Sequence, residues 1–81
     1  MININDEILD IAVKLSKPIE YLDLETRSYN ALRRWGIRSV ADVAAAKREN
    51  KLPKIRNLGE KSIYEIDYKL ERYLKGETNG K

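Results

Sequence analysis

Residues 56–63, Arg-Asn-Leu-Gly-Glu-Lys-Ser-Ile, place a glycine directly before a segment with the periodicity of a long helix. Lys61 and Ser62 fall in the first helical turn, where backbone N–H groups lack intrahelical partners and the helix dipole is positive. Gly59 has no Cβ to hold another group away. This pattern is typical of a site for an anionic oxygen, with a nucleic-acid phosphate as the leading candidate. A turn glycine beside a solvated lysine is the alternative, since short glycine motifs often occur by chance.

Length and composition exclude several classes of function. The 81 residues predict one small domain and contain neither cysteine nor histidine. The absence of cysteine excludes disulfides and thiolate metal sites. The absence of histidine removes the commonest metal ligand and the commonest acid–base group. No nucleophile–base pair or tight acidic cluster is evident, so we expect no enzyme activity, no catalytic residue, no metal, no cofactor and no small-molecule substrate.

The sequence also predicts where the protein resides. The longest apolar run is far shorter than the roughly 20 residues of a membrane span. The acidic N-terminus, MININDEILD, lacks the basic region of a signal peptide. We therefore expect a cytoplasmic protein without a membrane partner.

The net charge of +3 is unevenly distributed. Residues 47–63 carry six basic and two acidic side chains, a local net charge of +4 around Gly59. Such an excess is typical of a surface that binds a polyanion. A generic solvated surface rich in lysine is the alternative.

The first predicted helix covers about residues 6–15, with Asn5 as its N-cap and Pro18 beyond its end. Its apolar face is formed by residues at spacings of four and three: Ile4, Ile8, Ile11 and Leu15. The outer face is acidic and matches nucleic acid poorly. We expect residues 1–17 to be an acidic amphipathic helix that packs on the domain or contacts a partner protein.

An extended or single-turn segment is predicted over residues 18–25, followed by a helix over residues 26–35. The expected apolar anchors of these two elements are Ile19, Leu22, Leu24, Ala31, Leu32 and Trp35. Gly36 is placed to end the helix in the left-handed conformation, with Ile37 packing back on it. Arg27, Asn30 and Arg34 share one polar face without an acid in register.

Two further helices are predicted. Ser39 and Asp42 form a capping box before a helix over about residues 40–47, in which we expect Val40, Val43 and Ala44 to be buried. A single turn near Pro53 should bury Leu52 and Ile55. The core face of a last helix over about residues 60–74 comprises Ile63, Ile66, Leu70, Tyr73 and Leu74, with Tyr64 and Tyr68 half-buried. Gly76 ends this helix, and residues 76–81 are predicted to be a disordered tail.

Two segments, LETRSYNALRRWGIRSVADV at 24–43 and LPKIRNLGEKSIYEI at 52–66, resemble the C-terminal domain of the bacterial RNA polymerase alpha subunit. The resemblance extends from about Pro18 to about Leu70, and the pairing of R-S-x-N-x-L with N-L-G-x-K-S-x-x-E-I is its specific signal. It implies an all-α fold at residues 18–75. That fold is a compact bundle of four short helices, related to helix-hairpin-helix folds, to which this sequence adds an N-terminal helix.

The resemblance also implies a site for double-stranded DNA. Arg27 matches an arginine that enters the minor groove, and Asn30 matches a neighbouring contact. Ala31 is implied to make at most a minor contact. The residues that match contacts to the phosphate backbone are Gly59, Lys61 and Ser62. Glu65 matches a glutamate at the edge of this surface and is expected to orient Arg27 or Asn30.

These roles imply a preference for A·T-rich DNA, where a narrow minor groove attracts arginine. The minor groove distinguishes A·T from G·C pairs but encodes little further sequence. We therefore expect a nucleoid-associated module of transcription that binds weakly and with a steep dependence on salt.

Departures from the family pattern leave alternatives open. In the family a flexible linker joins this domain to a large assembly domain, whereas an acidic helix stands there in this sequence. The protein is thus either an excised piece or a free-standing relative. Glu20 and Asp23 keep acids in the patch that meets the sigma factor, but Tyr21 replaces an expected acid. RNA polymerase, sigma factor and transcription regulators are possible partners. A protein-interaction module that has given up DNA, and a helix-hairpin-helix module of a repair enzyme, remain alternatives.

Overall fold

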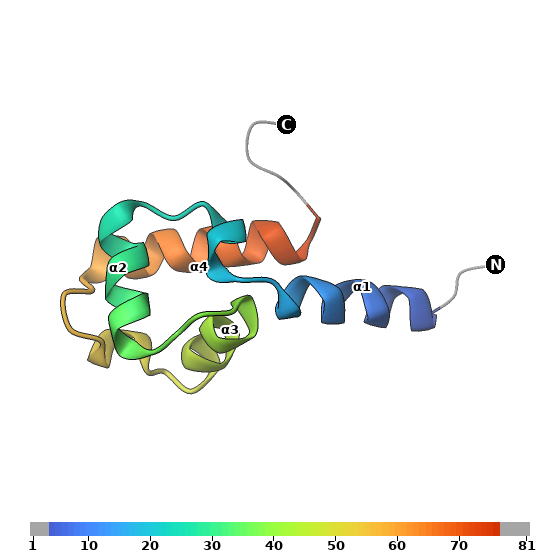
Figure 1. Ribbon diagram of the computed structural model, residues 1–81, viewed down its shortest axis with the longest axis horizontal. Coiled ribbons are helices and arrows are strands. Elements are labelled where there is room, and N and C mark those ends of the chain that lie inside the picture. Colours follow the sequence, from blue (N-terminus) through green and yellow to red (C-terminus); the bar gives the residue numbers. More distant parts are fainter. Residues whose placement is uncertain (1–3, 77–81) are drawn as a thin grey trace.

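The computed structural model describes residues 4–76, and the side chains of residues 8–76 among them. Within residues 4–76 the four α-helices are α1 (Ile4–Ser16), α2 (Thr26–Trp35), α3 (Val40–Arg48) and α4 (Glu60–Leu74), and the two 3₁₀ turns are η1 (Ile19–Leu22) and η2 (Leu52–Lys54). Helix α4 lies across one side of the bundle, α2 and α3 pack beside it, and α1 extends away from the other elements (Figure 1). The predicted all-α fold is confirmed.

One hydrophobic core joins α2, α3, α4 and both 3₁₀ turns. Its residues with the least exposure are Ile19, Leu22, Leu32, Val40, Val43 and Ile66. Leu52 and Ile55 are each 3% exposed, which confirms the turn predicted around Pro53. Burial of such side chains is the main stabilising contribution in a domain of this size.

Helix α2 ends as its sequence predicts. Gly36 has φ of 101°, in the left-handed region that glycine adopts without strain. The next residue, Ile37, donates its N–H to the carbonyl of Leu32 at 2.9 Å and is buried. The prediction for Trp35 is wrong, because its side chain is 49% exposed on the outer side of the last turn.

Helix α3 opens with the predicted capping box. Ser39 Oγ accepts from the backbone N–H of Asp42, and the Asp42 carboxylate accepts from the N–H groups of Ser39 and Arg38. The same segment pairs with the start of the domain through Ile19 N to Arg38 O, 3.0 Å, and Val40 N to Lys17 O, 2.8 Å. Within α3, Ala46 is buried while Ala44 is only partly buried, which corrects the predicted core face.

Helix α4 contributes Ile66 and Leu70 to the centre of the core, with Ile63, Tyr73 and Leu74 partly buried against it. An ion pair between Lys47 and Asp67 links α3 to α4. Tyr64 is 72% exposed, so its predicted half-burial is wrong, and Tyr68 is 47% exposed. Gly76 follows the helix with φ of 86°.

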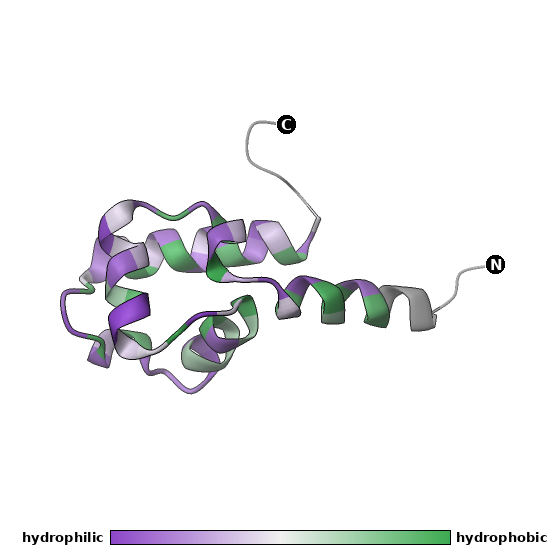
Figure 2. Cartoon of the chain, in the orientation of Figure 1, coloured by the Kyte–Doolittle hydropathy of each residue, from purple (hydrophilic) through white to green (hydrophobic). Residues whose placement is uncertain are grey.

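Helix α1 begins at Ile4, so Asn5 lies inside the helix and is not its N-cap. Leu15 packs against the core, whereas Ile8 and Ile11 are 58% and 46% exposed. The predicted apolar face is therefore only partly used within the domain, and hydrophobic residues run along the projecting helix (Figure 2). The side chain of Ile4 and the predicted tail at 77–81 lie outside what the structure describes.

Across residues 4–76, no helix combines the length and the hydropathy that a membrane crossing requires.

Candidate nucleic-acid interface

Arg27 lies between two neighbouring hollows on the surface. The first has a volume of about 520 Å³ and is lined by Arg27, Asn30, Ala31, Arg34 and Asn57. The second has a volume of about 340 Å³ and is lined by Glu25, Arg27, Lys61, Ser62, Tyr64, Glu65 and Tyr68. The structure therefore brings the first turn of α2 beside the first turn of α4, although the two are more than thirty residues apart in the sequence.

The first hollow displays the polar face of α2. Arg27, Asn30 and Arg34 are exposed, as expected from their shared helical face. Ala31 is only 4% exposed, so it can offer little more than its methyl group to a ligand. Asn57 closes the other side from the turn before α4, where its φ of 69° places it in the left-handed region. Asparagine tolerates this conformation better than most residues.

The second hollow includes the start of α4. Gly59 is the N-cap, so the free N–H groups of the first turn have no side-chain cap. Its φ of −89° is one that any residue adopts, and a Cβ built at this position meets nothing within 4 Å. Neither backbone conformation nor packing within the domain therefore requires glycine here. The space that the missing Cβ leaves is open to a group from another molecule.

Glu65 holds the two helix starts together. Its carboxylate accepts from Ser28 Oγ at 2.7 Å and from the backbone N–H of Glu25 at 2.7 Å. Lys69 Nζ lies 3.7 Å from the same carboxylate and donates to the carbonyl oxygen of Asp23 at 2.5 Å. Its hydrogen bonds go to Ser28, directly after Arg27, and to Glu25, two residues before it. Glu65 therefore fixes the start of α2, and the expectation that it orients Arg27 or Asn30 stays a prediction.

Sequence reasoning missed Ser28 and Lys69 as supports of this site. Ser28 is completely buried, and it has the one buried polar side chain found among residues 8–76. The sequence signal for this contact was the serine directly after Arg27 together with the glutamate of the N-L-G-x-K-S-x-x-E-I segment. It was inconspicuous because the two residues are 37 positions apart.

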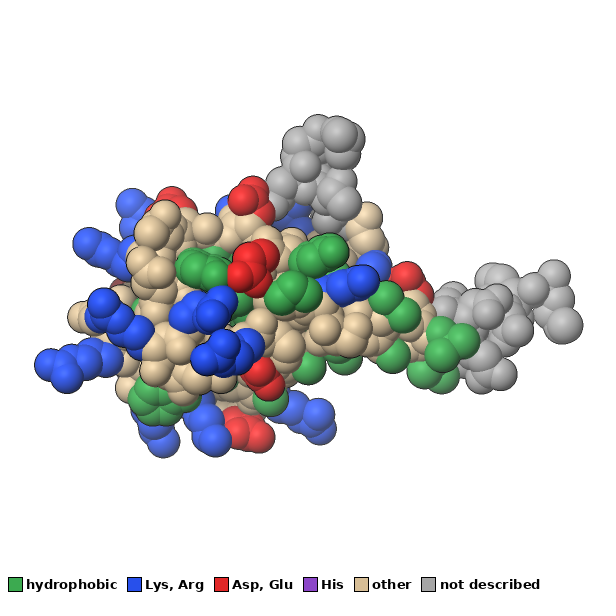
Figure 3. Space-filling view, in the orientation of Figure 1, with side chains coloured by type: hydrophobic (Ala, Val, Ile, Leu, Met, Phe, Trp, Pro, Cys, Tyr) green, Lys and Arg blue, Asp and Glu red, His purple; other side chains and the backbone are tan. Residues whose placement is uncertain are grey.

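Basic side chains gather over the end of the molecule where α2 and the segment leading into α4 lie (Figure 3). Arg27 and Arg34 project there from α2, and Lys61 projects from α4. Glu25 is an exposed acid that lines the second hollow, and Glu60, also exposed, directly precedes Lys61 in the first turn of α4. Within the part of the protein that the structure describes, no cluster of His, Cys, Asp or Glu could hold a metal ion.

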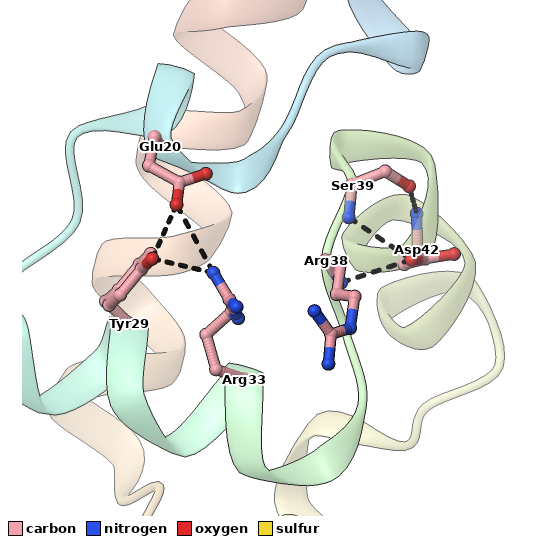
Figure 4. A network of polar contacts seen from close by, with 6 residues as sticks. All are labelled: Glu20, Tyr29, Arg33, Arg38, Ser39 and Asp42. Carbon is pink, nitrogen blue, oxygen red and sulfur yellow. Dashed lines mark hydrogen bonds and ion pairs between the residues drawn. The ribbon is translucent and has the colours of Figure 1, made fainter.

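Glu20 and Asp23, the predicted protein-contact acids, line neither hollow. The Glu20 carboxylate accepts from Tyr29 Oη at 2.5 Å and from Arg33 at 3.3 Å (Figure 4). The hydrogen bond from Tyr29 is the main cause that lowers the pKa of Glu20, and the same bond raises the pKa of Tyr29. Asp23 adopts φ of 57° at the end of η1. The structure leaves protein contact through these two residues as a prediction.

The fold and the basic end define a small all-helical domain whose polar surface is built from two helix starts. Residues 5–72 match the family of C-terminal domains from the alpha subunit of bacterial RNA polymerase, and the protein belongs to this family.

Curated relatives agree with this family. The sequence is 43% identical to the DNA-directed RNA polymerase subunit alpha of Mycoplasmoides gallisepticum, over 86% of this protein and 25% of the relative. It is 54% identical to the subunit of the same name from Staphylococcus aureus strain Newman, over 70% of this protein and 18% of the relative. The protein thus spans a quarter or less of these relatives. No solved structure matches it.

Proposed function

We propose that this domain binds double-stranded DNA in transcription, with Arg27 in the minor groove of an A·T-rich segment and the start of α4 on the adjacent phosphates. The observation that carries the proposal is the position of Arg27, which lines the same hollow as Lys61 and Ser62. One duplex can therefore meet a groove-entering arginine and a phosphate-binding helix start at the same time.

The groove contact follows from the chemistry of arginine. A narrow A·T-rich groove has a strong negative potential that favours an exposed guanidinium. Asn30 and Arg34 line the hollow beside Arg27 and can donate to base edges or sugar oxygens. Discrimination is then between A·T and G·C pairs rather than among specific sequences.

The phosphate contact uses the open start of α4. Lys61 supplies charge, Ser62 supplies a hydroxyl donor, and the free N–H groups point out of the first turn. The vacant space beside Gly59 lets a phosphate approach the backbone. These contacts hold the protein in register without reading sequence.

The proposed partners of this domain rest on analogy with its relatives, which are named DNA-directed RNA polymerase subunit alpha. We propose that this domain acts together with RNA polymerase on the nucleoid. Glu20 and Asp23 are the candidate contacts to a sigma factor or a transcription regulator. Glu65 serves the DNA surface by positioning α2 rather than by contacting bases.

A fluorescence-polarisation titration with an A·T-rich duplex tests the DNA site. Arg27→Ala should abolish most binding, whereas Arg38→Ala, which removes an equal charge beyond the opposite end of α2, should change it little. Equal losses from the two variants would show that the assigned surface is wrong. Lys69→Ala is an unsuitable control because Lys69 contacts Glu65 and Asp23.

A protein-interaction role is the second candidate, and the exposed apolar residues of α1 favour it. An NMR titration with the same duplex separates the two. Shifts confined to residues near 27–34 and 57–65 support DNA binding. An unchanged spectrum would reject DNA binding and favour the protein-interaction role.

A further inference from the structure

Tyr64 and Tyr68 line the second hollow together with Arg27, Lys61 and Ser62. We propose that these two tyrosines bind the sugar–phosphate backbone of the same DNA. They would extend the interface along α4 by about two turns beyond Lys61. The inference rests on the proposed function, and it adds residues that the resemblance does not assign.

Exposure sets these tyrosines apart from the other hydrophobic residues of α4. The ring centroids of Tyr64 and Tyr68 lie 6.3 Å apart, and the rings are nearly parallel, with an interplanar angle of 14°. Both residues are exposed despite their size. A tyrosine ring covers a deoxyribose with its apolar face, while its hydroxyl donates to a phosphate oxygen. Two adjacent exposed rings therefore suit a ligand with alternating apolar and anionic parts.

A cationic residue flanks the two tyrosines on each side along α4. Lys61, Tyr64, Tyr68 and Arg72 follow one another at spacings that keep them on one face of α4. Arg72 lies 5.4 Å from the centre of the Tyr68 ring and donates to Tyr68 Oη at 3.1 Å. The Tyr68 hydroxyl accepts this bond and keeps its own hydrogen to donate, and an incoming bond from a cation strengthens it as a donor.

The two acids in the hollow differ in how strongly they repel an incoming phosphate. Glu65 already accepts two hydrogen bonds and lies near Lys69, so its charge is largely compensated. Glu25 is exposed on the same hollow, where a carboxylate would repel a phosphate. Removing the charge of Glu25 should therefore strengthen binding if a backbone occupies the hollow.

The double variant Tyr64→Phe/Tyr68→Phe tests the proposal by removing two hydroxyls and leaving the rings in place. We expect binding to the A·T-rich duplex to weaken roughly three- to tenfold. The slope of log Kd against log salt should stay unchanged, because a neutral hydroxyl releases no counterion. Tyr21→Phe is the matched control, since Tyr21 is also exposed but lies away from the hollow against Tyr73.

The variant Glu25→Gln tests the repulsion between the Glu25 carboxylate and a phosphate, and it should tighten DNA binding severalfold. Glu49→Gln, at the end of α3, is the control and should change the affinity less. Wild-type affinity in the double tyrosine variant, or no difference between the two glutamine variants, would overturn the tyrosine contact. If Arg27→Ala still removes binding in that case, the proposed DNA function stands without this extension. If Arg27→Ala binds like the wild type, the DNA function itself fails.

Discussion

The hydroxyl of Ser28 donates a 2.7 Å hydrogen bond to the carboxylate of Glu65, which links the first turn of α2 to the second turn of α4. The hydroxyl is fully buried, and the second carboxylate oxygen accepts from the backbone N–H of Glu25. Glu25 is the N-cap of α2 but makes no cap bond with its own side chain. Glu65 therefore supports the helix start that carries Arg27.

Glu65→Ala should lower the free energy of unfolding by about 2 kcal/mol, because it leaves a buried hydroxyl and a backbone N–H without their acceptor. Ser28→Ala should cost less, about 1 kcal/mol, since it removes donor and buried polar group together. Urea denaturation measures both. Glu71→Ala, at an exposed position on the same helix, is the control and should cost little. A similar cost for Glu71→Ala and Glu65→Ala would contradict this role.

DNA affinity should fall steeply with salt. Each phosphate contact by a cation contributes about 0.9 to the slope of log K against log salt. Lys61→Gln should reduce that slope by about one contact, and Lys54→Gln, outside both hollows, should leave it unchanged. Titrations between about 50 and 200 mM salt measure the slope. A flat response in the wild type would argue against a phosphate-binding surface.

The capping box of α3 should make stability depend on pH. Hydrogen bonds from the N–H groups of Arg38 and Ser39 lower the pKa of Asp42 from its ordinary value of 3.8 (Figure 4). A folded-state pKa below the unfolded value means that the stabilisation is present above the unfolded pKa and is lost as pH falls through the folded pKa.

Asp42→Ala should therefore cost about 1 kcal/mol near neutral pH, and the cost should shrink below about pH 4. Thermal unfolding at several pH values measures it. Ser39→Ala removes a neutral hydroxyl, so its cost should vary much less with pH. If the cost of Asp42→Ala did not change with pH, the carboxylate bonds would not be responsible.

Leu15 and Ile8 allow a matched comparison on α1. Leu15 packs on the core, so Leu15→Ala should destabilise the domain by about 1–2 kcal/mol, less than for a fully buried leucine. Ile8 is 58% exposed, and Ile8→Ala should be close to neutral. Urea denaturation of the two variants gives the difference. Equal costs would mean that the exposed face of α1 is covered in solution.

Local signals were sufficient to predict α2, α3 and α4 closely. Gly36 and the Ser39–Asp42 box each mark a helix boundary within a few residues, so no knowledge of the tertiary structure was needed. The start of α1 was predicted less well, because Asn5 is a good cap by type but lies inside the helix.

Exposure was harder to predict than helicity. Trp35 was predicted to anchor its helix and Tyr64 to be half-buried, but their side chains are 49% and 72% exposed. Helical periodicity does not determine how far a neighbouring element covers such a residue. The bond between Ser28 and Glu65, and that between Lys69 and the Asp23 carbonyl, join segments about forty residues apart. No periodic pattern encodes such pairs. The roles assigned to Arg27, Asn30 and Lys61 came from the family resemblance and stay predictions.

The pairing of residues 17–19 with residues 38–40 has a mechanical consequence. Lys17 O and Ile19 N bond to Val40 N and Arg38 O, at the junction between α2 and α3. A pull on α1 is resisted by the packing of Leu15 on the core, by the bond from Lys14 to the Leu74 carbonyl and by these two backbone bonds. Arg27 lies at the far end of α2 from that junction. Tension applied to α1 would thus be taken up before it reaches the arginine, and the surface around Arg27 would be insulated from movements of α1.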